Sequence, residues 1–157
     1  MVTRIGNLAP ERHGTTIVET AVILPAFFLF VFAIIEFGHA QLVNNMLSSA
    51  CRKGARVGAV EGTTTAQVIA QVNETMSPVA PAASIAVFVK DASIYDTGIP
   101  PTTGVGIEAM PNVELSDAEP RQMFVIRASV PLNDVALVPM PFLKNVVLDG
   151  QSFMRHE

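Results

Sequence analysis

A long apolar segment near the N-terminus constrains this chain more than any other feature of its sequence. Between Thr20 and Ile35 no side chain carries a charge. At about 1.5 Å of rise per residue, a helix over residues 17–37 would be roughly 30 Å long, which is the thickness of the hydrocarbon core of a bilayer. The segment therefore predicts one membrane span, and it places the function of the protein at a membrane.

The size and composition of the chain limit the kind of domain that can accompany the span. With 157 residues there is room for an anchor and one further domain. The net charge of -4 argues against nucleic acid as a partner, because phosphate binding needs clustered lysine and arginine. Cys51 is the single cysteine, so no internal disulfide and no CxxC metal site can form. We expect no cofactor and no metal.

The polar residues before the apolar segment have three interpretations. Residues 1–13 carry two arginines against one glutamate, as a basic leader does. The segment is then an uncleaved signal anchor, or a secretory signal peptide removed after Ala40, or a type IV prepilin-like signal. In the third case a peptidase cuts after Gly14, and the mature protein, with the apolar segment at its head, begins at Thr15.

Glu19 favours the third interpretation. A carboxylate inside hydrocarbon costs several kcal/mol unless it has a partner. Cleavage after Gly14 creates an amino group on Thr15, four residues before Glu19, on the same chain or on a neighbouring subunit. We therefore predict that Glu19 pairs with this amine and sets the register of assembly. The alternative is that Glu19 lies at the level of the lipid headgroups.

The apolar pattern continues beyond the span as an amphipathic helix. We predict one helix over residues 15–61, membrane-spanning at about 17–37, with a kink at Pro25 because proline removes a backbone hydrogen bond. Ala50, Gly54 and Gly58 recur at every fourth residue, a spacing that permits close approach of another backbone. They serve either packing of the following domain on the helix or association between the helices of different subunits.

The remaining residues, 62–157, predict a small α+β domain outside the cytoplasm. Long domains cross the membrane largely regardless of flanking charge, so the nearly balanced basic residues on the two sides of the span do not oppose this orientation. The apolar pattern predicts a short helix over residues 65–76, and the prolines of residues 77–81 end it. An antiparallel sheet of three or four strands is predicted from residues 84–90, 123–130 and 146–154, with a possible bulge at Gly150 and a possible short strand at 113–115. Residues 91–120 are otherwise a loop, and 135–143, with two prolines, form an edge cover or rest on the membrane surface.

No constellation of residues predicts catalysis. The histidines lie in the leader (His13), at the membrane exit (His39) and at the tail (His156), where we expect surface or interfacial positions. Cys51 has basic neighbours that could lower its pKa but no histidine within reach, and we interpret it as a packing residue. Residues 104–109 lack a nucleotide-binding pattern, and the carboxylates of residues 108–119 lack calcium-binding spacing. We predict that the protein is not an enzyme.

Several short motifs, taken together, resemble the TadE-like family. The resemblance covers about residues 12–60, with a weaker echo at 148–155. The first motifs are a leader that ends in glycine, at Arg12–Gly14, and a glutamate soon after it, at Val18-Glu19. A Leu-Pro pair follows at Leu24-Pro25, and an Ile-Glu-Phe-Gly sequence stands at the end of the apolar segment, within Ile34–Gly38. The last motif is a segment of basic and small residues at Ala50–Arg56. Two departures are the paired Arg52-Lys53 and a longer, loop-rich domain after Glu61.

The resemblance implies a minor pseudopilin-like component of the tight-adherence (Flp) pilus or a related secretion machine. A prepilin peptidase would remove residues 1–14, cutting between Gly14 and Thr15. The mature protein would cross the inner membrane once, with a cytoplasmic N-terminus, or join a surface filament. Its partners would be the membrane, other pilin-like subunits, pilus assembly proteins and the peptidase. The alternative is a signal-anchored or secreted binding domain with no link to pili.

Overall fold

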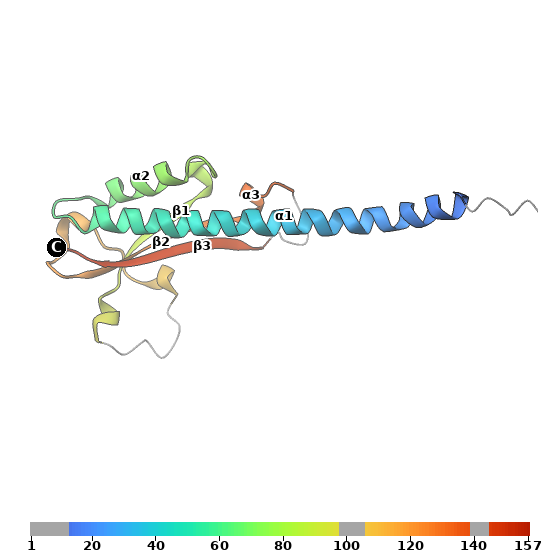
Figure 1. The fold of residues 1–157 in the computed structure, drawn as a ribbon. Coiled ribbons are helices and arrows are strands. Elements are labelled where there is room, and N and C mark those ends of the chain that lie inside the picture. Colours follow the sequence, from blue (N-terminus) through green and yellow to red (C-terminus); the bar gives the residue numbers. More distant parts are fainter. Residues whose placement is uncertain (1–12, 98–105, 139–144) are drawn as a thin grey trace, which may run out of the picture. The chain divides into compact units, whose positions relative to one another are not determined.

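A computed structural model describes residues 13–97, 106–138 and 145–157. It divides into two compact units, the first ending at Ile35 and the second running from Glu36 to Glu157. We call the second unit the head. Helix α1 (His13–Gly58) begins in the first unit and ends in the head (Figure 1).

Helix α1 confirms the predicted long helix. It has 46 residues and ends at Gly58, three residues earlier than predicted. Pro25 lies inside it and does not end it, and the kink at this residue stays a prediction. In the first unit the large apolar side chains face outward, with Ile17 70% and Leu29 65% exposed. Among the described residues this helix alone is long and apolar enough to cross a membrane.

Helix α2 (Thr65–Met76) has the predicted bounds. The Thr64 hydroxyl accepts from the Gln67 backbone N–H, and the Gln67 side chain accepts in return from the Thr64 N–H. This capping box satisfies two N–H groups that a helix start leaves free. Val68, Val72 and Met76 form the buried face, as the apolar spacing predicts.

The sheet confirms the predicted α+β fold class. Strands β1 (Ala86–Asp91), β2 (Met123–Pro131) and β3 (Val147–Arg155) pair antiparallel in the order β1-β2-β3. Each lies within two residues of the predicted bounds. The predicted bulge at Gly150 is wrong, because Gly150 pairs with Ala128 in a register that continues one-to-one on both sides.

The described parts of the connections contain several short helical turns. The 3-10 helices η1 (Ala82–Ser84), η2 (Ser93–Thr97), η3 (Ile107–Ala109) and η4 (Leu115–Asp117) lie outside the sheet, and helix α3 (Leu132–Val135) follows β2. The predicted strand at 113–115 is wrong: an isolated bridge joins Asn112 to Lys90, whereas the Leu115 N–H donates to the Thr65 hydroxyl at the start of α2. Residues 139–143 of the predicted edge segment lie outside the described residues.

The two faces of the sheet are covered by different elements (Figure 1). The face toward α1 and α2 carries alternate residues of β2, all buried, namely Phe124, Ile126, Ala128 and Val130. On the other face Val125 packs with Ala92, Ile107 and Met110. The head thus has helices α1 and α2 on one side of its sheet, and the described residues of η2 and η3 on the other.

Candidate assembly and anchoring site

The predicted processing and assembly residues lie in the first unit. The backbone of Gly14 and Thr15 is helical, and leader residues 1–12 lie outside the described residues. Glu19 is exposed on α1, and no ion pair engages it within the described part of the chain. The neighbouring Thr20 hydroxyl donates to the Thr16 carbonyl at 2.8 Å, so its polar group is satisfied within the helix. The Glu19 carboxylate is therefore open to a partner outside the chain.

The small residues of α1 face the head itself. Ala50 is fully buried in the core shared with α2 and the sheet. A Cβ atom on Gly54 would come within 2.9 Å of the Val72 side chain, and one on Gly58 within 2.8 Å of the Leu115 side chain. Of the two interpretations of this spacing, the structure favours packing within the domain. Another subunit's helix would have to displace α2 or Leu115 to reach these residues.

A closer approach lies at the crossing of β3 and α1. A Cβ atom on Gly150 would lie 2.5 Å from the Ser48 nitrogen and 2.6 Å from the Leu47 carbonyl carbon. Beside it, the Cys51 thiol donates to the Gly150 carbonyl at 3.2 Å. Sequence reasoning missed this contact, although a glycine inside a strand is the usual signal for close approach of another backbone.

The chemistry of Cys51 follows from its burial. Desolvation raises the pKa of the Cys51 thiol to about 11, and the nearby Arg52 charge and a backbone hydrogen bond only partly oppose it. The hypothesis that basic neighbours lower this pKa is therefore wrong, because burial is the larger effect. The protonated thiol is a donor within the core rather than a nucleophile.

Two polar residues of α1, at the beginning of the head, bind a segment about a hundred residues later in the chain. Glu36 is 3% exposed, and its Oε2 accepts a hydrogen bond from the Val138 N–H at 3.0 Å. One turn later, His39 Nε2 donates to the Val135 carbonyl at 2.8 Å. We call residues 135–138 the tethered segment. Glu36 Oε1 is buried and has no hydrogen-bond partner in the described structure.

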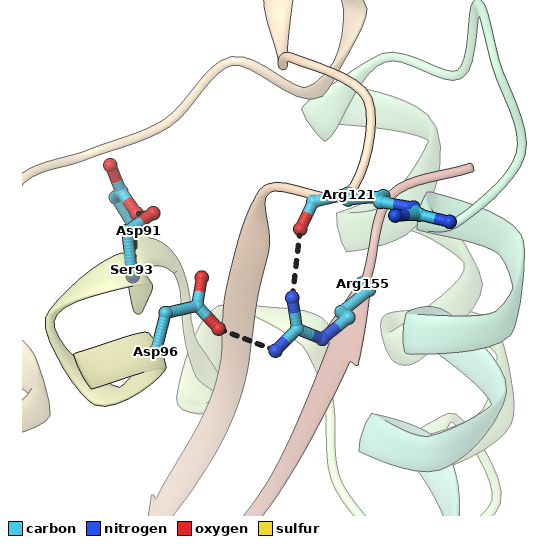
Figure 2. A network of polar contacts seen from close by, with 5 residues as sticks. All are labelled: Asp91, Ser93, Asp96, Arg121 and Arg155. Atoms are coloured by element: carbon cyan, nitrogen blue, oxygen red, sulfur yellow. Dashed lines mark hydrogen bonds and ion pairs between the residues drawn. The ribbon is translucent and has the colours of Figure 1, made fainter. Parts of the chain in front are cut away.

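The opposite end of the sheet carries carboxylates in an open pocket of about 580 Å³. Arg155 donates to Asp96 at 2.6 Å and to the Arg121 carbonyl at 3.4 Å (Figure 2). Burial opposes ionisation of Asp91, but hydrogen bonds from Ser93 and Gln122 outweigh it and hold the pKa of this carboxyl below its usual range. These contacts fix η2 on the sheet. No group of histidine, cysteine and acidic residues suited to a metal occurs in the ranges described.

The tail histidine is placed differently from its prediction. His156 is 4% exposed rather than at the surface, so the predicted surface position is wrong. Its backbone pairs with Gln122 and Arg121, and the next N–H, that of Glu157, donates to the Ala59 carbonyl at 2.8 Å. The chain end is thereby held between β2 and the end of α1, and the histidine ring is enclosed with it.

Comparison with known proteins finds a similarity that lies within helix α1. Residues 14–56 match the family model of TadE-like proteins. No curated protein and no solved structure matches the chain. The matched residues run from the predicted cleavage site through the apolar segment to the part of α1 that packs in the head. The resemblance deduced from the sequence motifs is therefore confirmed, and the residues that are similar to TadE-like proteins all lie within helix α1.

Proposed function

We propose that the protein is a minor pilin-like subunit that takes part in assembly of a tight-adherence pilus or a related secretion machine. A prepilin peptidase removes the leader between Gly14 and Thr15. The apolar part of α1 crosses the inner membrane and packs beside similar helices of other subunits, and the head stays outside the cytoplasm.

The observation that carries this proposal is the exposure of the first unit. A helix that is apolar on all sides needs lipid or other helices around it. In this chain the apolar stretch of α1 that is long enough to span a membrane is 0% buried. The same segment lies within the match to TadE-like proteins, and this resemblance supports a role in the pilus system.

Glu19 gives this helix its register in the proposal. The carboxylate pairs with the Thr15 amine created by cleavage, on its own chain or on a neighbour. Glu19 is exposed in the single chain, so it is accessible to such a partner. A charge pair inside hydrocarbon forms only where both members meet, which restricts how far one helix can slide along another.

The rival function is an anchored or secreted binding domain without a pilus. In that case the apolar helix serves only to hold the head at the membrane or is removed after Ala40. Helix α1 continues without a break past Ala40 into the head, where Val43 and Leu47 are fully buried. Cleavage after Ala40 would cut this helix just before its buried part, so the structure supports a helix that stays attached to the head.

Replacing residues 21–35 with leucine distinguishes an assembly helix from a simple anchor. The variant keeps Gly14, Thr15 and Glu19, so we expect normal processing and membrane insertion. We expect loss of assembly, because the shape of the helix surface that contacts other subunits is gone. Carbonate extraction measures insertion, and subunit crosslinking in native membranes measures assembly. Normal crosslinking in an inserted variant would show that the helix is only an anchor.

A further inference from the structure

We propose that the tethered segment of the head, residues 135–138, docks on the lipid surface of the membrane and inserts Leu137 among the headgroups. This inference rests on the proposed membrane span. It adds a second, interfacial contact that orients the head on the bilayer.

Hydrogen bonds to Glu36 and His39 determine where the tethered segment lies in the head. Glu36 is the first residue of the head and directly follows the apolar part of α1. Its carboxylate binds the Val138 N–H, and His39 binds the Val135 carbonyl. The segment therefore lies beside the first turn of α1 within the head, where these two hydrogen bonds hold it.

Several large apolar side chains at this end of the head are exposed. Leu137 is 60% exposed, and Phe37, next to Glu36 on α1, is 67% exposed. Val147 is 55% exposed and pairs with Pro131 at the end of β2 that leads into α3. The adjacent Val146 carbonyl accepts from the Leu132 N–H at 2.9 Å, which joins β3 to the start of α3. Large exposed apolar side chains gathered at one end of a domain indicate a surface that is covered in the working protein.

The other end of the sheet has the opposite character. There the pocket rim is formed by acidic and polar side chains, including Asp91, Asp96, Asp117 and Glu119. The head thus has an apolar end, which includes its first residues, and an acidic end at the opposite end of its sheet. Because the residues of the apolar end include those that follow the proposed span in sequence, this end fits a lipid interface, where apolar side chains enter the headgroup and acyl boundary.

Two details specify the lipid contact. Asp134 is exposed next to the tethered segment, and its negative charge is repelled by anionic lipid, so we expect zwitterionic lipid to suffice. The buried Glu36 Oε1 lacks a donor within the described chain. Interfacial water is a donor of the kind that such an oxygen accepts.

The test places a fluorophore at single cysteines in the full chain, reconstituted in phosphatidylcholine vesicles that carry a nitroxide on the headgroup or deep in the acyl chain. The background variant is Cys51→Ser, whose hydroxyl can still donate to the Gly150 carbonyl. Leu137→Cys reports on the tethered segment. Val60→Cys is the matched control, because Val60 is 53% exposed and lies beyond the end of α1, more than about 30 Å along the helix from Glu36. Phe28→Cys reports on the span.

We expect the headgroup nitroxide to quench position 137 several-fold more strongly than position 60, and the deep nitroxide to quench position 28. Adding Glu36→Ala should reduce quenching at position 137. Adding Glu36→Gln should leave that quenching in place, because the amide oxygen still accepts from the Val138 N–H. Neither variant should change quenching at position 28. Equal, weak quenching at 137 and 60 with strong quenching at 28 would overturn the docking and leave the span intact. Loss of quenching at 28 would overturn the span and the docking together. Protection of 137 from both nitroxide and aqueous iodide, increasing with protein density, would show that another copy covers the segment and would also overturn the proposal.

Discussion

Glu19→Ala is expected to leave the protein processed and inserted in the membrane but to abolish its assembly with other pilin-like subunits. In the proposed assembly the Glu19 carboxylate neutralises the Thr15 amine in a medium that solvates neither group. Removal of one member of a buried pair costs about 3–5 kcal/mol. Since each 1.4 kcal/mol is about tenfold in an equilibrium constant, association between subunits should weaken by more than about 100-fold.

The measurement is crosslinking between subunits in native membranes, with the mature N-terminus determined in the same sample. Glu19→Asp keeps the charge and should retain part of the assembly. Glu61→Ala removes one negative charge from an exposed position after α1 and should assemble normally. If Glu19→Ala assembles as well as the unchanged protein, Glu19 has no role in register and lies at the headgroups.

Gly150→Ala is expected to destabilise the head strongly. The added Cβ would lie 2.5 Å from the Ser48 nitrogen and 2.6 Å from the Leu47 carbonyl carbon. Both are backbone atoms of a helix, so neither can rotate away, and β3 must move off α1. Overpacking of this kind costs about 1–3 kcal/mol and occasionally more. We expect a value at the upper end, seen as a fall in Tm of roughly 10 °C for a domain of this size.

Thermal unfolding of the full chain in detergent, followed by circular dichroism, measures this effect. Gly38→Ala is the matched control, because a Cβ on Gly38 would meet nothing within 4 Å. Alanine is favoured over glycine inside a helix by up to about 1 kcal/mol, so the control should be as stable as the unchanged protein or more so. An unchanged Tm for Gly150→Ala would mean that β3 does not cross α1 as closely as described.

The fold could be predicted largely because its elements follow local patterns. The continuous apolar run and the amphipathic pattern after it predict α1, and the proline-bounded pattern after Thr64 predicts α2. Alternation over β2 predicts which of its residues face the helices, and Phe124, Ile126 and Ala128 are buried there as expected. The prediction of a strand at 113–115 was wrong because of a contact with a distant part of the chain. Leu115 is fully buried, and its N–H donates to the Thr65 hydroxyl instead of to a neighbouring strand.

The contacts that position the site could not be predicted, since they join residues far apart in the chain. Nothing near Glu36 indicates that its carboxylate binds the backbone of Val138. Gly150 suggests a local irregularity of the strand, and only the structure shows that α1 occupies the space where a side chain would be. Burial likewise reversed the expected pKa shift of Cys51, because sequence neighbours reveal nearby charges but not the removal of water.

The N-terminus of the protein recovered from native membranes is the decisive measurement for the proposed assembly role. Cleavage after Gly14 creates the amine that Glu19 needs, and it leaves the apolar helix joined to the head. Intact mass and N-terminal sequencing identify the first residue. We expect Thr15, whereas Met1 would mean an uncleaved anchor and Gln41 a released domain, and either of these results would contradict the proposal.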